Sequence, residues 1–274
     1  MTAIDYEVEY NNRVRVPENP AIIAGWVRDA AAYREAHPPR VLRYGDGVRH
    51  TIDVFSGDDA DTATVMFIHG GYWQALDASF FSHCAAGLNA HGISVALPNY
   101  DLCPAVSVAD IIDQMRAACR ALATFNKRLV VSGNSAGGHL AACLLATDWH
   151  AIDQSLPDDF MRAGYAISGL FDLRPLVPTS INTSLRMDAA SAHDVSPLFW
   201  TPPAGSTFDA AVGGDESGEY FRQSRTLVAE WGAAGVITRV GTVPGANHFT
   251  AIAPLADARS EMVLRLKEMA HISN

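Results

Sequence analysis

The segment 128–146 constrains the fold of this chain more than any other, because it joins a predicted strand to a predicted helix through the motif Gly133-Asn-Ser-Ala-Gly137. The β-branched run Leu129–Val131 is typical of a buried strand, and the alanine- and leucine-rich stretch after the motif favours a helix. A sharp strand-to-helix turn forces the serine into a strained backbone conformation, and the flanking glycines avoid the collisions that larger residues would make. The pattern predicts a nucleophile elbow that exposes the Ser135 hydroxyl and places the Ala136 N–H at a helix N-terminus.

The rest of the chain alternates short apolar runs with amphipathic segments, which predicts a mostly parallel sheet with helices on both faces. Hydrophobic residues make up 49% of the 274 residues, enough for one substantial core, so we expect a single domain over residues 1–274. The other predicted strands are Val41–Tyr44, Thr51–Phe55, Thr64–Ile68, Ile93–Leu97, Ala163–Ile167, Phe208–Val212 and Val236–Val240. The predicted helices are Ala21–Ala36, Ala78–Ala90, one that Ser107 opens as a capping box, Tyr220–Trp231 and Pro254–Met269.

Two segments interrupt this alternation. Residues 1–40 form an N-terminal extension, which either lies over the rim of a pocket or covers an edge of the sheet. Residues 171–203 contain five prolines and little periodicity. Insertions of this length between sheet elements usually serve as lids or binding loops, so this segment is predicted to be a cap over the substrate.

The charge and composition of the chain restrict the classes of partner that it can bind. A formal net charge of −10 disfavours nucleic acid and anionic membrane surfaces, and we expect neither a signal peptide nor a membrane-spanning run. The four cysteines show no metal-binding or C-x-x-C spacing, so we expect free, buried thiols in a cytoplasmic protein. We therefore expect a small-molecule substrate, no metal and no cofactor; a homodimer is compatible with the sequence. The glycines at 133–138 lack the G-x-G-x-x-G spacing of a dinucleotide site.

A serine nucleophile needs a base, and ten histidines compete for that role. The base is expected after the last strand and before the C-terminal helix. His248 occupies that position in a glycine-containing loop. The other histidines lie in the tail, on predicted helices or too early in the chain, and His69 is better suited to fixing a loop.

The base in turn needs a carboxylate to hold its tautomer. Asp215 follows the strand Phe208–Val212 after two glycines, which let the loop turn toward the carboxyl edge of the sheet, and it is the predicted partner. Asp172 is the rival, with a cap on the segment 171–203 as its alternative role. Glu216 is adjacent to Asp215 and is expected to point the other way.

The motif His69-Gly-Gly-Tyr-Trp73 leaves a buried strand early in the chain, where glycines let the backbone approach a substrate. We expect the N–H groups of Gly71, Tyr72 and Ala136 to form an oxyanion hole.

These motifs together resemble the kynurenine formamidase (arylformamidase) branch of the α/β-hydrolases, which is related to the hormone-sensitive-lipase-like esterases. The resemblance is carried by His-Gly-Gly-Tyr-Trp at 69–73, Gly-Asn-Ser-Ala-Gly-Gly-His at 133–139, Gly-Gly-Asp at 213–215 and Asn-His-Phe at 247–249. The segment 99–104 is similar to a Tyr-Arg-Leu-Ala-Pro-Glu loop of those esterases, but it has Asp101 in place of the arginine. The resemblance spans roughly residues 60–250 and implies an α/β-hydrolase fold with an eight-stranded type of sheet.

The resemblance also implies hydrolysis of an aryl formamide such as N-formylkynurenine to the amine and formate. A formyl group needs almost no acyl pocket, whereas an aryl leaving group favours aromatic walls. The predicted substrate-binding residues are Tyr72, Trp73, Asn134, Phe171 and Phe249. A carboxylesterase acting on short acyl or aryl esters would use the same residues. A hydrolase-fold binding protein without turnover is disfavoured because the serine, acid and histidine all occur in the expected order.

Overall fold

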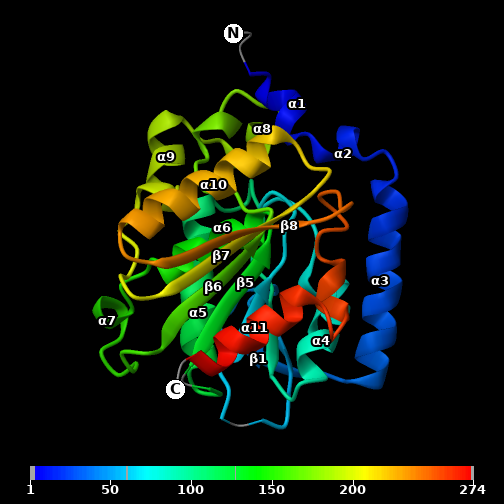
Figure 1. Ribbon diagram of the computed structural model, residues 1–274, viewed down its shortest axis with the longest axis vertical. Coiled ribbons are helices and arrows are strands. Elements are labelled where there is room, and N and C mark those ends of the chain that lie inside the picture. Colours follow the sequence, from blue (N-terminus) through cyan, green and yellow to red (C-terminus); the bar gives the residue numbers. More distant parts are fainter. Residues whose placement is uncertain (1–3, 60, 127, 273–274) are drawn as a thin grey trace.

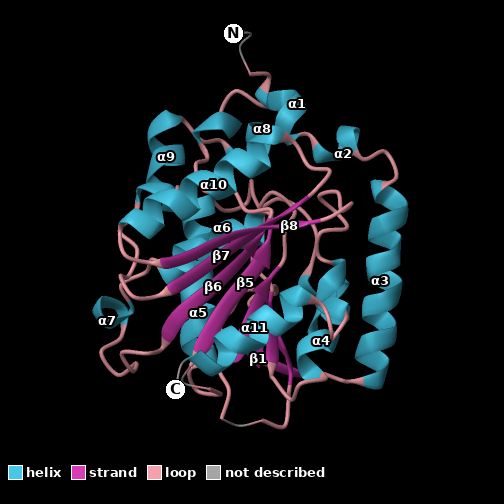
Figure 2. Cartoon of the chain, viewed as in Figure 1, coloured by secondary structure: helices cyan, strands magenta, loops and turns pink. Residues whose placement is uncertain are grey.

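Strands β1 to β8 form one sheet in the order β1-β2-β4-β3-β5-β6-β7-β8, with helices on both of its faces (Figures 1 and 2). The computed structural model describes residues 4–59, 61–126 and 128–272, so residues 1–3 of the predicted N-terminal extension lie outside the described part. Strands β3 to β8 pair in parallel, whereas β1 and β2 are antiparallel to their neighbours. The strands are β1 Arg40–Arg43, β2 Thr51–Phe55, β3 Thr64–Ile68, β4 Val95–Pro98, β5 Leu129–Asn134, β6 Met161–Ile167, β7 Thr207–Gly213 and β8 Ile237–Val243.

The helices fall between these strands as the alternating pattern predicts. The α-helices are α1 Tyr6–Tyr10, α2 Asn12–Arg15, α3 Asn19–Ala36, α4 Ala86–Asn89, α5 Val108–Leu122, α6 Ala136–Leu145, α7 Trp149–Ile152, α8 Asn182–Leu185, α9 Ala189–Asp194, α10 Gly218–Ala233 and α11 Glu261–Ile272. Short 3₁₀ helices occur at Ala78–Ala85, Arg174–Leu176, Pro197–Phe199 and Ala253–Ala256. Ser107 caps α5 with a capping box to Asp110, as predicted. The expected α/β-hydrolase architecture is confirmed.

Two apolar cores cover the two faces of the sheet. Alternate residues of a strand point to opposite faces, so Met66 and Ile68 of β3 face one core while Val65 and Phe67 face the other. Helices α5, α6 and α10 cover the first face, and α3, α4 and α11 cover the second. The central strands are therefore apolar on both sides, which explains their continuous hydrophobic runs.

The carboxyl ends of the parallel strands converge at one edge of the molecule, where α1, α2 and α8 also lie (Figure 1). Within the N-terminal extension, α3 packs along the 3₁₀ helix Ala78–Ala85, while α1 and α2 reach this edge. Helix α3 thus belongs to the cover over one face of the sheet, and α1 and α2 lie at the strand ends. The segment 171–203 contributes α8 and α9, and its 3₁₀ helix Arg174–Leu176 contacts α1. Both segments are in place to surround a site at the strand ends.

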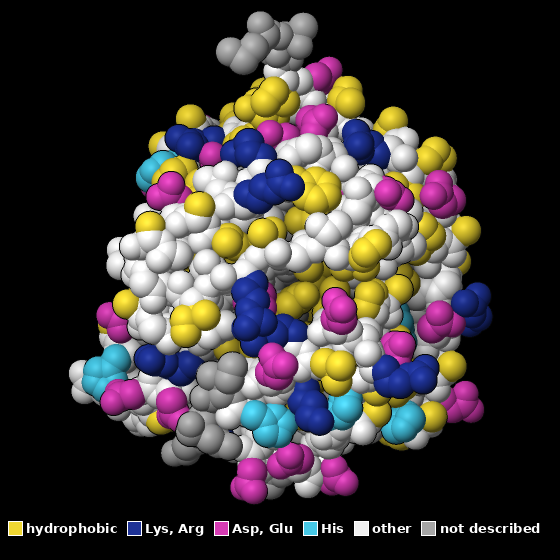
Figure 3. Space-filling model, viewed as in Figure 1, with side chains coloured by type: hydrophobic (Ala, Val, Ile, Leu, Met, Phe, Trp, Pro, Cys, Tyr) yellow, Lys and Arg dark blue, Asp and Glu magenta, His cyan; other side chains and the backbone are white. Residues whose placement is uncertain are grey.

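The surface and the cysteines agree with the composition. Figure 3 shows acidic and basic side chains interspersed on the face that carries β8 and α11. All four cysteines are free and buried, as predicted. Among the described helices, we find none that combines the length and the apolar character needed to cross a membrane.

Candidate active site

The turn between β5 and α6 has the geometry predicted for an elbow. Ser135 has φ of +56° and ψ of −117°, in the left-handed half of backbone space that non-glycine residues rarely adopt. A Cβ atom on Gly137 would lie 1.9 Å from the carbonyl oxygen of Ile68, and one on Gly133 would lie 2.3 Å from the Gly137 backbone. Glycine is therefore required at both positions, because the start of α6 lies too close to the ends of β3 and β5 for a side chain.

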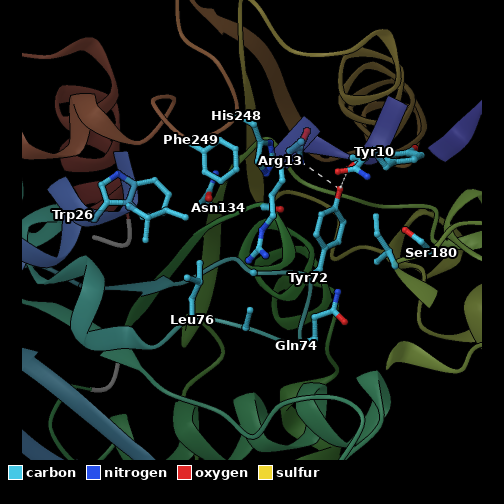
Figure 4. A pocket seen from close by; sticks show the side chains of 17 residues that line it. Tyr10, Arg13, Trp26, Tyr72, Gln74, Leu76, Asn134, Ser180, His248 and Phe249 are labelled. Carbon is cyan, nitrogen blue, oxygen red and sulfur yellow. Dashed lines mark hydrogen bonds between the residues drawn. The ribbon is translucent and has the colours of Figure 1, made fainter. Parts of the chain in front are cut away.

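Ser135 opens onto a cavity of about 390 Å³ at the strand ends (Figure 4). Trp26 and Phe249 form one wall and Tyr72 the opposite wall, with Leu76 and Gln74 between them. The residues that line it are Tyr10, Asn11, Asn12, Arg13, Ile23, Trp26, Gly71, Tyr72, Gln74, Ala75, Leu76, Asn134, Ser135, Ser180, Ile181, His248 and Phe249. The cavity therefore brings together the predicted nucleophile, the predicted base and part of the predicted oxyanion loop.

His248 pairs with Glu216 and not with Asp215. Its Nδ1 lies 2.7 Å from Glu216 Oε2, and the Glu216 side chain is fully buried. An ionised carboxylate can only accept, so Nδ1 donates the proton and Nε2 keeps its lone pair for use as a base. Asp215 is exposed, and its backbone N–H bonds to the Ala246 carbonyl. The prediction that Asp215 orients His248 is therefore wrong.

The local backbone explains the difference. After β7 the chain turns back on itself, so that the N–H of Glu216 bonds to the carbonyl of Gly213 at 3.1 Å. The second carboxylate oxygen, Oε1, accepts from the Gly213 N–H at 2.7 Å and from the Ser168 hydroxyl. Alternation of neighbouring side chains holds for an extended strand, whereas this turn directs the Glu216 side chain toward the sheet edge.

Asp172, the rival candidate, does not contact the histidine. Its carboxylate binds the Arg174 guanidinium through two hydrogen bonds of 2.9 Å and also accepts from the Arg174 N–H. Asp172 thus fixes the start of the segment 171–203, which agrees with the capping role considered for it.

The predicted oxyanion loop approaches the nucleophile closely. A Cβ atom on Gly70 would lie 3.1 Å from Ser135 Cβ, so this stretch of backbone passes directly over the serine. Gly71, Tyr72 and Trp73 all have positive φ values, of 112°, 50° and 56°. Among the hydrogen bonds of the described residues, none uses the N–H of Gly71, Tyr72 or Ala136. These three N–H groups therefore have no hydrogen-bond partner among the described residues, as an oxyanion hole requires.

The buried ring of His69 holds this loop in place, as its position in the sequence suggested. Its ring stacks on Tyr100 at 4.3 Å, and its nitrogens contact the Gly70 carbonyl at 2.7 Å and Asn99 Oδ1 at 3.3 Å. Complete burial lowers the pKa of His69 to about 4, so the ring is neutral near pH 7. His69 therefore does not carry a charge in the site.

The hydroxyl of Tyr72 ties the same loop to the N-terminal helices. It donates to the Tyr10 carbonyl at 2.6 Å and lies 2.7 Å from the Tyr220 hydroxyl. Asn12 donates to both hydroxyls, at 2.7 Å to Tyr220 and 3.3 Å to Tyr72. The Tyr220 ring in turn lies 4.7 Å from the His248 ring. One polar cluster thus spans the oxyanion loop, the base and α2.

The predicted substrate-binding residues divide into two groups. Tyr72, Asn134 and Phe249 line the cavity. Trp73 and Phe171 do not, because both are fully buried in the core: Trp73 packs edge-on against His139, and Phe171 against Phe208. Placing Trp73 and Phe171 in the substrate pocket was therefore wrong.

Several cavity residues escaped prediction. Tyr10, Asn12 and Arg13 belong to two very short helices without motif or periodicity, so the sequence offers no signal that they reach the site. Glu216 did offer a signal, since it is one residue from the predicted acid. Ser180 and Ile181 lie within the predicted cap segment and do line the cavity, although neither was singled out.

Comparison with known proteins agrees with this geometry. A family model described as the alpha/beta hydrolase fold matches residues 65–251, which is more than half of the chain. The chain belongs to the α/β-hydrolase family. The matched part contains Ser135, Glu216, His248 and the loop 69–73. The resemblance described from the sequence is thereby confirmed at the level of the family, and the protein is a hydrolase.

Individual relatives refine the comparison. This α/β-hydrolase is 29% identical to the kynurenine formamidase of Salmo salar over 237 residues, which are 82% of this chain and 80% of the relative. It is 33% identical to a protein of Silicibacter sp. TM1040 that is provisionally described as a thioesterase, with a TM-score of 0.85 over 96% of this chain and 98% of the other. An esterase of the bacterial hormone-sensitive lipase family matches with 22% identity and a TM-score of 0.66 over 94% of this chain and 98% of the other, a likeness of fold alone.

Proposed function

We propose that this hydrolase cleaves an aryl formamide such as N-formylkynurenine, releasing the aromatic amine and formate through an acyl-enzyme on Ser135. One observation carries the proposal: a strained serine and a histidine held by a buried carboxylate line the same cavity. A serine hydroxyl becomes a competent nucleophile only beside such a base.

The reaction follows from the contacts of these residues. His248 Nε2 takes the proton of the Ser135 hydroxyl as Oγ attacks the formyl carbon, and Glu216 stabilises the imidazolium that forms. The N–H groups of Gly71, Tyr72 and Ala136 hold the negative oxygen, and each such donor contributes a factor of about 10²–10³ in rate. His248 then protonates the departing amine nitrogen, and the C–N bond breaks.

The second half repeats the same steps with water. His248 removes a proton from a water molecule as the water oxygen attacks the formyl ester of Ser135. The ester bond breaks, formate leaves and the proton returns to the serine oxygen.

Two features support an aryl formamide as the substrate. The cavity offers aromatic walls, from Trp26, Tyr72 and Phe249, against which an aryl leaving group can pack. The 29% identity to the salmon kynurenine formamidase, over about four-fifths of both chains, points to the same leaving group and acyl group.

A carboxylesterase acting on short acyl or aryl esters is the second candidate. The Silicibacter relative, provisionally a thioesterase, favours it because thioesters and esters share this chemistry. Steady-state kinetics with N-formylkynurenine and p-nitrophenyl acetate distinguish the two. We expect the formamide to have the higher kcat/KM; a value hundreds of times below that of the ester would refute the formamidase proposal.

A further inference from the structure

Charge is distributed unevenly between this protein and its cavity. The chain has a formal net charge of −10, yet the residues that line the cavity include no aspartate or glutamate and one arginine, Arg13. Glu216 lies behind His248 with its side chain fully buried, and its oxygens accept hydrogen bonds there from the imidazole and two other donors. Among the side chains that line the cavity itself, a substrate therefore meets one permanent charge, and it is positive.

Arg13 is positioned to meet a substrate. It lies on α2 and extends into the cavity between Asn134 and Tyr72 (Figure 4). Its residue is exposed, and its guanidinium forms no hydrogen bond or ion pair with the described residues. A guanidinium has five N–H donors and usually pairs with a carboxylate when one is near. Since Arg13 has no such partner among the described residues, its donors remain for a ligand.

Both glutamates of α1 are already engaged, and Glu9 accepts from the Glu219 N–H at 3.1 Å. The carboxylate of Glu7 accepts from the Ser180 N–H and hydroxyl, both at 2.7 Å, and from the Asn11 amide at 3.0 Å. Those bonds hold the pKa of Glu7 below its usual range, and they join α1 to the segment 171–203. Glu7 thus helps to build the rim and leaves Arg13 without an internal counter-ion.

We propose that Arg13 binds a carboxylate on the leaving group of the substrate, so that the enzyme selects anionic aryl compounds over neutral ones. This inference rests on the proposed hydrolytic site. The α2 backbone carries Arg13 on the same rim as Tyr10 and Asn12, which the Tyr72 hydroxyl fixes in place. A planar guanidinium can hold both carboxylate oxygens at once, which orients the substrate as well as attracting it.

The experiment compares pairs of substrates that differ only in this charge. The first pair is N-formylkynurenine and its carboxamide, with formate release as the readout. The second is 3-carboxyphenyl acetate and 3-carbamoylphenyl acetate. The ester pair keeps the test valid if formamides are not cleaved, so failure of the proposed reaction and failure of the Arg13 proposal give different results.

Three variants report on the role of Arg13. In Arg13→Gln we expect kcat/KM for the carboxylate substrates to fall about tenfold, mainly through KM, while the carboxamides change less than twofold. Arg13→Lys should recover part of the loss because it restores the charge without the fork. Arg15→Gln is the control, since Arg15 is an exposed arginine of the same helix but does not line the cavity. This variant should leave kcat/KM unchanged for both members of each pair. An equal loss on both members of a pair, or no loss on either, would overturn the proposal.

Discussion

The pairing of His248 with Glu216 makes a sharp prediction for Glu216→Gln. In the native site, Oε1 of Glu216 accepts from the Gly213 N–H and the Ser168 hydroxyl, while Oε2 accepts from His248 Nδ1. A glutamine must place its oxygen toward the two donors, since the reverse orientation would leave both unpaired at about 1–3 kcal/mol each. Its NH₂ group then faces Nδ1 and donates to it.

This reversal moves the imidazole proton to the nitrogen that should act as the base. With Nε2 protonated, His248 cannot accept the proton of Ser135, and the carboxylate no longer stabilises the imidazolium. Loss of the correct tautomer costs about 10⁴ in kcat in such sites, equivalent to about 5.5 kcal/mol at 1.36 kcal/mol per tenfold. We expect KM to change little, because Glu216 lies behind the histidine and does not line the cavity.

Asp215→Asn is the matched control, since it also converts one acid into its amide in the same turn. Asp215 is exposed, and among the described residues it bonds through its backbone N–H, so we expect kcat within about threefold of the parent. Steady-state assays on both variants, with thermal unfolding to verify the fold, decide the matter. A large loss in Asp215→Asn together with a nearly unaffected Glu216→Gln would refute the assignment.

Three further predictions concern the nucleophile, the loop anchor and a buried histidine. Ser135→Ala should abolish turnover and fluorophosphonate labelling with an unchanged melting temperature; continued labelling would contradict the elbow assignment. Tyr72→Phe leaves the Tyr10 carbonyl without its donor, so the free energy of unfolding in urea should fall by about 1–3 kcal/mol and kcat should fall with it; a fully stable variant would exclude this anchor. Burial lowers the pKa of His139 to about 4, below about 6.5 in the unfolded chain, so the unfolded state binds more protons between these values and stability falls as pH drops through this window. From pH 7 to pH 5 the free energy of unfolding should fall by about 2 kcal/mol through this group, and this fall should disappear in His139→Gln. An identical pH dependence of unfolding in both proteins would show that His139 does not cause it.

The fold was predictable because the central strands are covered on both faces and therefore read as unbroken apolar runs. The prediction was least accurate at the edge of the sheet. Strand β8 was expected at Val236–Val240 and occupies Ile237–Val243, because an exposed edge strand can carry threonine, arginine and glycine. Its apolar signal therefore ends before the strand does.

The site was predictable where topology alone sets the position, as it does for the elbow serine and for a histidine after the last strand. It was not predictable where a turn decides which side chain faces inward, as at Glu216. A residue next to the active-site loop in sequence also need not point its side chain into the cavity. Trp73 directly follows Tyr72, yet its φ is positive and its side chain is buried in the core beside His139.

The cavity wall formed by α1, α2 and α3 has a consequence for how such enzymes diverge. The reacting residues and their loop all lie within the stretch 65–251 that the family shares, whereas Tyr10, Arg13 and Trp26 lie before it. The residues that break the bond and one part of the cavity that accepts the molecule are thus encoded in separate parts of the chain. Substitutions in the first thirty residues can change which molecules enter while the hydrolytic steps stay the same.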